Sequence, residues 1–476
     1  MIGAVEHWLL VAGAVIVLGY FVGLNGTYLA TSALAFFSLR RYSRRLKSLY
    51  VEELVASPLP PITLIAPAYN EEATCVEATR ALLTLQYPSY EIVVVNDGSK
   101  DRTVERMTEA FDLVATPRMP TADLGTKPVR GVYRSRRHPE LWLVDKVNGG
   151  KADALNAGVA HCRTPLFCAL DADTLVEGDG LARLVRPFLE RQDTIAAGGI
   201  IRIVNDCEVR GGLVQRVRIP RRWLARFQVL EYLRAFLAGR MGWAALDATL
   251  IVSGAFGLFK RSAVIEVGGF ATDTVGEDME LVVRMHRYFR EQRRPYHITF
   301  VPDPVAWTEC PETIRVLGRQ RDRWQRGLTE VLVRHRRMLF NPRYGRIGMI
   351  AFPYFFLFEM LGPVVELGGY AALVVAIATR RFDAAYALAF LAVSVVLGLT
   401  LSLAAVGLEE LAFRRYARLR DVLLLFVIAF VENFGYRQLT SWWRLKGLWS
   451  ALRRETGWGQ MERRGFASPA PGASAP

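Results

Sequence analysis

Two carboxylates lie two positions apart at the end of an apolar run. Phe167 to Leu170 carries no charge, and Asp171 and Asp173 follow it. Side chains at positions i and i+2 of a strand point the same way, so both aspartates could reach one Mg²⁺ or Mn²⁺. These cations prefer hard oxygen ligands, which carboxylates and phosphates both supply. Taken alone, the pattern also fits a turn with two solvated acids, so the choice depends on the neighbouring motifs.

A glycine pair followed by a lysine precedes this aspartate pair. Gly149 and Gly150 stand before Lys151 at the start of a predicted helix. Backbone N–H groups at a helix start form a phosphate site together with an ammonium group. A loop with a solvated lysine would fit the same tract. Because the tract is expected at the same edge as the aspartates, the sequence favours a diphosphate site.

Two further motifs could complete the site. Asp278 precedes a helical pattern, where an acid can cap the helix, and it could act as a general base if it lies in the same crevice. In the helix expected from about residue 312 to residue 338, spacings of i, i+3 and i+4 bring an amide, a guanidinium and a broad aromatic ring onto one face. Such a face suits pyrophosphate and sugar. Its side chains are Gln320, Arg323 and Trp324.

The elements that position these residues are expected to form an α/β domain. Between residues 61 and 204, short apolar runs alternate with helical stretches, which predicts βαβ units and a mainly parallel sheet. Ligands bind outside the carboxyl ends of strands in such sheets, so polar groups that follow the runs should face one crevice. These groups are Pro67 to Glu72, Asn96 to Ser99 and Asp171 to Asp173. The stretch from about 112 to 145 is expected to be a mobile loop.

The composition indicates that the chain contacts both water and lipid. The mean hydropathy of +0.18 is high for a soluble enzyme, and the long apolar runs lie in the first forty residues and from about 347 to 440. The net charge of +14 could suggest nucleic acid, but arginines cluster beside the apolar runs, as at 40–45. The positive-inside rule explains this better. The five cysteines lack the paired spacing of a metal site.

These features predict five segments in an inner-membrane, multi-pass protein with a cytoplasmic catalytic domain. The number of crossings and the side of the C-terminus stay open, because a fully crossing last segment would put a basic tail outside. The segments are an N-terminal transmembrane helix with a basic stop at 1–45, the cytoplasmic domain at 46–310, an amphipathic interfacial helix at 311–345, transmembrane or interfacial helices at 346–446, and a basic, then disordered tail at 447–476.

The motifs, in this order, resemble those of membrane-embedded family 2 glycosyltransferases, which include the synthases of poly-N-acetylglucosamine, hyaluronan, chitin and cellulose. The resemblance covers roughly residues 60 to 340 and implies a GT-A fold and a nucleotide-activated sugar, most often UDP-linked. Asp278 then matches the catalytic base, Asp173 the metal-bound aspartate for Mg²⁺ or Mn²⁺, and Asp171 its neighbour on the nucleotide side. The remaining matches are Ala68, Tyr69, Glu71 and Asp97 for base and ribose, Lys151 for the diphosphate, and Gln320, Arg323 and Trp324 for the pyrophosphate and acceptor end.

The leading prediction is an inverting, metal-dependent glycosyltransferase that extends a β-linked polysaccharide, with export partners left open. A non-processive enzyme that glycosylates a lipid is the alternative, because the Gln-x-x-Arg-Trp motif also occurs in lipid-modifying relatives. A transporter or assembly scaffold with an inactive transferase domain is a third interpretation, and the complete set of acidic residues argues against it. Fewer membrane helices than in the largest synthases put polymer secretion in doubt.

Overall fold

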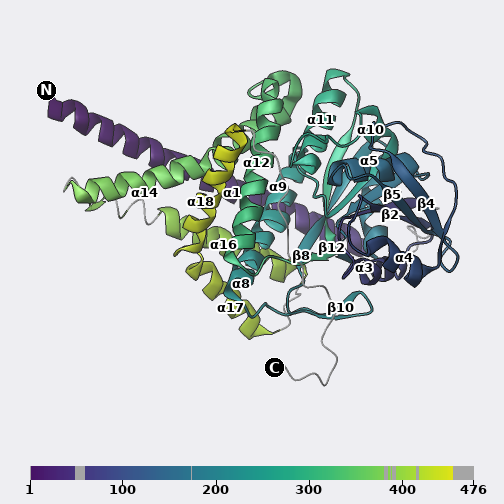
Figure 1. Cartoon of the computed structure of the whole chain (residues 1–476). Coiled ribbons are helices and arrows are strands. Elements are labelled where there is room, and N and C mark those ends of the chain that lie inside the picture. Colours follow the sequence, from purple (N-terminus) through teal and green to yellow (C-terminus); the bar gives the residue numbers. More distant parts are fainter. Residues whose placement is uncertain are drawn as a thin grey trace.

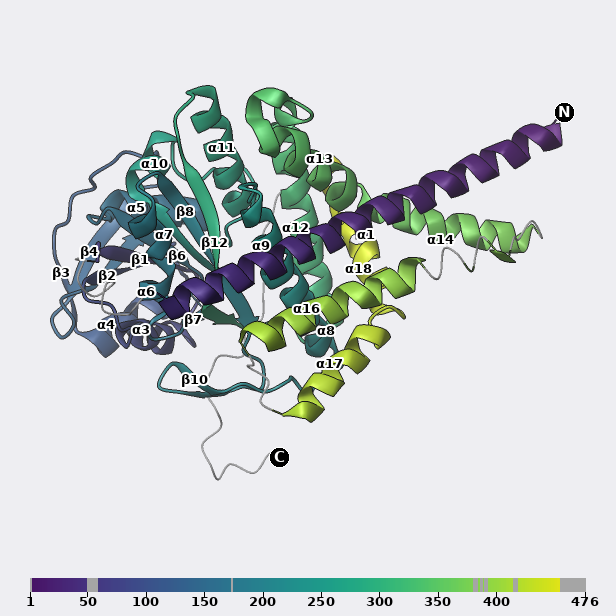
Figure 2. The ribbon, with the colours of Figure 1, turned by 180° about the vertical axis from the view of Figure 1, so that it is seen from behind.

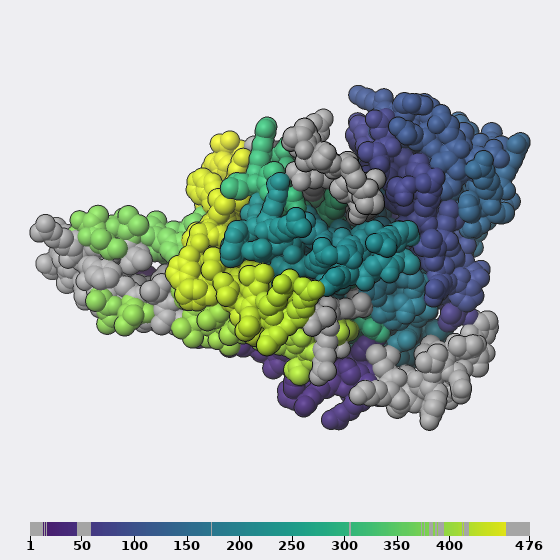
Figure 3. Space-filling view, turned by 90° about the horizontal axis from the view of Figure 1, so that it is seen from below, coloured from purple at the N-terminus to yellow at the C-terminus, as the bar shows by residue number. Residues whose placement is uncertain are grey.

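The protein consists of an α/β part and a group of helices beside it (Figure 1). The computed structural model describes residues 2–48, 59–172, 174–379, 384–385, 388, 393–413 and 418–453. Helix α1, Ile2–Ser48, runs along the back of both parts in the view of Figure 1 and crosses the front of the reverse view in Figure 2. In the view from below, α14, Gly362–Ala378, projects at the end opposite the early strands (Figure 3). Asp173 and residues 454–476 of the predicted 447–476 tail lie outside the described residues.

Ten strands form one sheet. They are β1 Ile62–Ala68, β2 Tyr90–Asn96, β3 Leu113–Ala115, β4 Val129–Ser135, β5 Leu141–Lys146, β6 Leu166–Leu170, β7 Leu175–Val176, β8 Thr194–Ile203, β11 Phe256–Lys260 and β12 His297–Thr308. Their order is β3-β4-β5-β2-β1-β6-β11-β8-β12-β7. Strands β5, β2, β1 and β6 are parallel, as are β8 and β12, whereas β11 runs antiparallel between β6 and β8. The predicted α/β class with a mainly parallel sheet is confirmed.

Helices flank the sheet and build the neighbouring group. Those of the α/β part are α3 Cys75–Leu83, α4 Thr103–Phe111, α5 Lys151–His161, α6 Gly180–Leu184, α7 Arg186–Glu190, α10 Arg261–Glu266 and α11 Glu277–Glu291. The others are α8 Trp223–Tyr232, α9 Arg240–Ala245, α12 Ile314–Arg334, α13 Phe352–Tyr354, α16 Gly398–Ala412, α17 Leu419–Val431 and α18 Tyr436–Leu452, with π-helical turns at Leu233–Gly239, Ile347–Ala351 and Phe355–Met360.

The central strands are apolar because helices cover both faces of the sheet. Leu64 faces the cluster formed with α3 and α4, whereas Ile65 faces the cluster formed with α5 and α11. Strands buried on both faces read as continuous apolar runs, as β6 does. At Gly158 a Cβ atom would lie 2.3 Å from Cγ2 of Ile65. Helix α5 therefore packs directly on β1, which fixes the start of α5 relative to the strand ends.

The parallel arrangement brings the polar strand ends together. Tyr69 follows β1, Asp97 follows β2 and Asp171 follows β6, and all three line one cavity. Because β11 runs in the opposite direction, the residues before it, including Gly254, reach the same edge. The crevice predicted at the carboxyl ends of the strands is therefore present.

The stretch from 112 to 145 differs from the expected mobile loop. It contains β3 and β4 and most of β5, which extend the sheet at one edge. The connection between β3 and β4 is anchored by Arg118, whose guanidinium lies 2.9 Å from Glu91 and 4.4 Å from the ring centroid of Trp142. Turn residues in this stretch concealed the strands, which pair with one another and with β5.

In the part of the chain that the structure describes, few helices are long and apolar enough to cross a membrane. Among the described residues, Val17–Arg44 within α1 is the one helix long and apolar enough to cross a membrane, and a second span results if the bent pair Ile347–Met360 and Gly362–Ala372 counts as one. Helix α12 lies within the interfacial segment expected at 311–345. The wider multi-pass arrangement stays a prediction.

Helix α12 approaches the start of α11 closely, and this contact can be tested. A Cβ atom at Gly327 would lie 2.9 Å from the Cα atom of Gly276. Because backbone atoms cannot move aside as a side chain can, we expect Gly327→Ala to cost about 1–3 kcal/mol. The measurement is the thermal unfolding midpoint of the purified protein. Gly407→Ala in α16 is the control, since no atom lies within 4 Å of its added Cβ; equal midpoints in the two variants would contradict the prediction.

Candidate active site

A cavity of about 1220 Å³ runs from the polar edge of the sheet into the helical group. Typical small-molecule sites occupy about 300–1,000 Å³, so this cavity has room for more than one ligand. Helices α1, α12, α14 and α18 contribute its far wall. All predicted site residues that the structure describes line it, namely Ala68, Tyr69, Glu71, Asp97, Lys151, Asp171, Asp278, Gln320, Arg323 and Trp324.

Lys151 connects the two acidic motifs. It is the first residue of α5, and its Nζ lies 2.5 Å from Oδ1 of Asp171 and 3.4 Å from Oε1 of Glu277. Burial alone would lower the pKa of Lys151, but the charges of Asp171, Glu277 and Asp278 outweigh it and raise the pKa on balance. The lysine therefore keeps its positive charge at the sheet edge.

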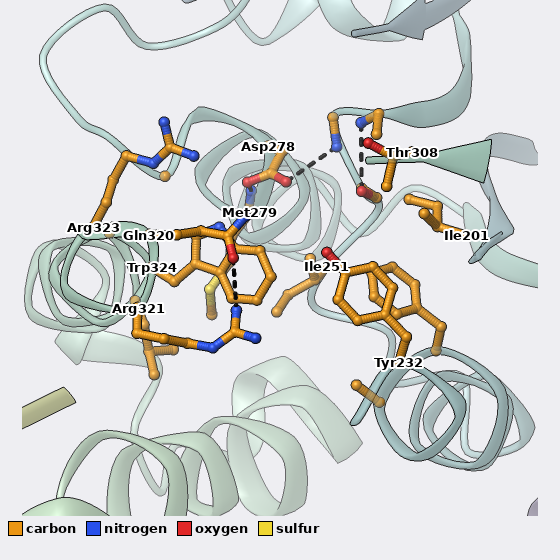
Figure 4. Close-up of a pocket in the computed structure, with 18 of the residues that line it drawn as sticks. Ile201, Tyr232, Ile251, Asp278, Met279, Thr308, Gln320, Arg321, Arg323 and Trp324 are labelled. Atoms are coloured by element: carbon orange, nitrogen blue, oxygen red, sulfur yellow. Dashed lines mark hydrogen bonds between the residues drawn. The ribbon is translucent and has the colours of Figure 1, made fainter. Parts of the chain in front are cut away.

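Asp278 faces the cavity from the first turn of α11 (Figure 4). Its Oδ2 accepts a hydrogen bond from the backbone N–H of Gly254 at 3.1 Å. A Cβ atom at Gly254 would lie 3.0 Å from Nζ of Lys151 and 3.7 Å from Oδ2 of Asp278. Because Gly254 has no side chain, the Lys151 ammonium and the Asp278 carboxylate can both lie close to its backbone.

Glu277 was not predicted as a site residue. Of the acids at the start of this helix, only Asp278 was expected to do more than cap the helix. It is only 4% exposed. Burial raises its pKa, the Lys151 ammonium opposes the rise, and the neighbouring Asp278 charge adds to it. Its link to Lys151 joins segments 126 positions apart, which no local spacing reveals.

The loops after β1 and β2 are tied to one another. The backbone N–H of Asn70 donates to Oγ of Ser99 at 2.9 Å, and the N–H of Lys100 donates to Oδ1 of Asn70 at 2.8 Å. Asp97 is 4% exposed, and its carboxylate accepts hydrogen bonds from the N–H groups of the two glycines before Lys151, at 3.0 and 2.8 Å. The edge where Tyr69 and Glu71 lie is therefore held in place before any ligand binds.

Helix α12 presents the predicted face of Gln320, Arg323 and Trp324 to the cavity (Figure 4). Arg321, which helical spacing assigns to another face and which was not predicted, also lines the cavity. Its guanidinium lies 2.6 Å from Glu231, donates to Oε1 of Gln320 at 3.0 Å and sits 4.3 Å from the ring centroid of Trp324. Arg321 therefore holds both cavity-lining neighbours in place.

A divalent cation fits the chemistry at the end of β6. The described residues contain no group of three or more His, Cys, Asp or Glu side chains that could hold a metal by themselves. The Asp171 side chain is 30% exposed and lines the cavity, with Oδ1 paired to Lys151. Mg²⁺ commonly binds through one or two carboxylates together with substrate phosphates. The donor set present therefore suits a cation that arrives with a phosphate ligand.

Comparison with known proteins relates the chain to one family. Residues 60–327 match the family described as "Glycosyltransferase like family 2". The chain is 29% identical over 274 residues to a poly-beta-1,6-N-acetyl-D-glucosamine synthase of Staphylococcus epidermidis, and 30% identical over 277 residues to that of Staphylococcus aureus strain COL. These alignments cover 57% and 58% of this chain and 56% of each relative. The chain thus spans about half the length of the curated relatives it matches.

A solved structure shares the fold. A mannosyltransferase of Pyrobaculum calidifontis, in complex with GDP-Man and Mn²⁺, aligns with a TM-score of 0.52 at 20% sequence identity. The alignment covers 88% of this chain and 99% of that one. The predicted GT-A fold is thereby confirmed.

Glu280 fastens α11 to the end of α12. It is 1% exposed, lies 2.7 Å from Nη2 of Arg284 and 3.2 Å from Nε2 of His335. Burial alone would raise its pKa, but His335 and Arg284 lower it to about 2 from the usual 4.5. A lowered pKa stabilises the fold above about pH 4.5, and this contribution disappears as the pH falls through about 2.

We therefore expect Glu280→Gln to lower the free energy of unfolding at pH 7. The shift from 4.5 to about 2 corresponds to about 3 kcal/mol, and the deficit should shrink when unfolding is measured at about pH 3. Glu291→Gln is the control, because that carboxylate also has a lowered pKa but its side chain is 31% exposed. A deficit of equal size at both pH values would contradict this origin of the stability.

Proposed function

The chain belongs to glycosyltransferase-like family 2, and from this premise we propose that it is an inverting, metal-dependent glycosyltransferase of the inner membrane. It transfers a sugar from a UDP-sugar to the end of a growing β-linked polysaccharide. The observation that supports this most is that Asp278 lines the same cavity as the Lys151–Asp171 pair and Trp324. A base, a cation for the leaving group and an aromatic face for a sugar thus share one space.

The sheet edge forms the donor side. Ala68, Tyr69, Glu71 and Asp97 receive the base and ribose, and Lys151 lies where the diphosphate ends. The positive charge on Lys151 attracts the phosphates and opposes their growing negative charge as the bond to the sugar breaks. A Mg²⁺ or Mn²⁺ ion on Asp171 and Asp173, when bound, would supply further Lewis-acid charge stabilisation to the departing diphosphate.

Asp278 and α12 form the acceptor side. The Asp278 carboxylate takes the proton from an acceptor hydroxyl, and the oxygen attacks C1 of the sugar from the face opposite the diphosphate, which inverts the anomeric carbon. The Trp324 ring is 42% exposed and offers an apolar face to a sugar. Gln320 and Arg323 supply hydrogen-bond donors beside it.

Polar groups on part of the cavity wall suit a saccharide acceptor. Beyond Trp324 the cavity is lined by Tyr28, Glu359, Glu366 and Arg444, which carry hydroxyl, carboxylate and guanidinium groups. Tyr28 and Arg444 both hydrogen-bond Glu359, and Glu366 accepts from Ser441. These groups can also exchange hydrogen bonds with sugar hydroxyls, whereas an acyl chain offers none. The names of the curated relatives, poly-beta-1,6-N-acetyl-D-glucosamine synthases, agree with this acceptor.

The first experiment supplies the purified protein with a panel of nucleotide sugars and measures UDP or GDP release and product length. We expect the highest release with UDP-N-acetylglucosamine, loss of release with a chelator, and recovery with Mg²⁺ or Mn²⁺. A product that lengthens with time supports the polysaccharide acceptor. A single sugar on a lipid would replace it with the lipid-modifying alternative, and no release from any donor would contradict transferase activity.

A second prediction concerns the base. Asp278→Asn keeps the shape of the side chain but cannot accept the proton, so kcat should fall about 10²- to 10⁴-fold. UDP affinity, measured by calorimetry, should stay within about twofold, because the proton transfer is not part of nucleotide binding. Asp273→Asn is the control, since that side chain is 72% exposed and pairs with Arg334 outside the cavity. Full turnover in Asp278→Asn would remove Asp278 from this role.

A further inference from the structure

A lysine is completely buried behind the nucleotide end of the cavity. Lys146 is the last residue of β5 and has 0% exposure. Its Nζ donates to Oδ1 of Asp97 at 2.7 Å and to the carbonyl oxygen of Val147 at 2.6 Å, and it lies 2.5 Å from Oδ1 of Asp153. An ammonium group has three protons, so each of its hydrogen bonds has a partner within the protein.

The two carboxylates connect Lys146 to the neighbouring backbone, including the glycines before Lys151. Oδ1 of Asp97 also accepts from the N–H of Gly149, and Oδ2 accepts from the N–H of Gly150. Asp153, in the first turn of α5, accepts from the N–H of Lys127 at 3.1 Å. The cluster therefore connects the ends of β2 and β5, the start of α5 and the connection before β4.

The backbone between the cluster and Lys151 has little freedom. A Cβ atom at Gly149 would lie 2.5 Å from Cγ of Asp153, and Gly150 has a φ of +89°, a conformation that glycine adopts without strain. Lys151 is the next residue. Its approach to Asp171 therefore depends on how Asp97 holds the two glycines.

Asp97 keeps limited capacity for a ligand. A carboxylate has about four acceptor sites, and Lys146, Gly149 and Gly150 occupy three of them. The remaining site is on Oδ2, and Asp97 lines the cavity. Lys146 thus determines which oxygen of Asp97 can face a nucleotide.

We propose that Lys146 is a positioning residue of the donor site: it sets the Asp97 carboxylate and the Gly149–Lys151 segment relative to one another, and so determines nucleotide affinity. This inference rests on the proposed function for its nucleotide. The competing explanation is that Lys146 only neutralises two buried acids. That role would affect stability, whereas a positioning role also affects the loop and the ligand.

Three variants separate these explanations. Lys146→Met leaves two carboxylates without their cation, so its unfolding midpoint should fall. In Lys146→Met/Asp153→Asn, Asp97 is the one carboxylate of the pair left charged, and the N–H groups of Gly149 and Gly150 still donate to it, so this variant should be more stable than Lys146→Met. Asp153→Asn alone keeps the Lys146–Asp97 contact. The control is Lys127→Met, which removes an exposed ammonium while its backbone N–H still reaches Asp153.

The measurements are the dissociation constant of UDP and amide hydrogen exchange over residues 147–155. In the double variant we expect UDP binding to weaken at least about tenfold and exchange of this segment to accelerate, although this variant is more stable than Lys146→Met. Asp153→Asn and Lys127→Met should bind UDP within about twofold of the unmodified protein. Wild-type affinity or unchanged exchange in the double variant would overturn the inference.

The two proposals fail in distinguishable ways. If the unmodified protein binds no UDP, the proposed nucleotide is wrong, and hydrogen exchange in the variants still decides the role of Lys146. If the unmodified protein binds UDP and the double variant binds it equally well, only the inference about Lys146 fails. Should Lys146→Met not fold, the double variant carries the test.

Discussion

The candidate site depends on one ammonium group that two carboxylates share. Lys151 at the start of α5 pairs with Asp171 after β6 and with Glu277 at the start of α11. Without that charge, the two carboxylates and Asp278 would repel one another in a partly buried space. The same contacts place Asp278 beside the end of β6. Electrostatic attraction thus brings together the proposed donor edge and the proposed base, which the chain order keeps about a hundred residues apart.

Close helix packing then connects this edge to the helical group. A Cβ atom at Gly447 of α18 would lie 2.4 Å from the carbonyl oxygen of Asp322 in α12, so the two backbones approach as small residues permit. Arg321 pairs with Glu231, and Arg202 of β8 pairs with Glu409 of α16 at 2.6 Å. A shift of α12 would have to break its contacts with Gly447 and Glu231, so Trp324 keeps a fixed position relative to Asp278.

Local patterns and general topology were sufficient to predict part of the site from the sequence. Parallel strands end at one edge, so the residues after β1, β2 and β6 could be assigned to one crevice before their contacts were known. The i, i+3, i+4 spacing likewise placed Gln320, Arg323 and Trp324 on one face. The strands β3 and β4 were missed because they carry polar residues among turn residues and lie at or next to the edge of the sheet. Asp173 lies outside the described residues, and its role stays a prediction.

The residues that the sequence did not identify act through partners far along the chain. Arg321 needs Glu231, 90 positions earlier, and Lys146 needs Asp97, 49 positions earlier. Each is a buried charge, and burying a charge is costly unless a partner compensates it. Motif spacing reveals side chains that face a ligand, but it cannot reveal the charges behind them. The geometry of the proposed nucleotide site therefore depends on a second layer of ion pairs, which are found from the three-dimensional structure and not from motif spacing.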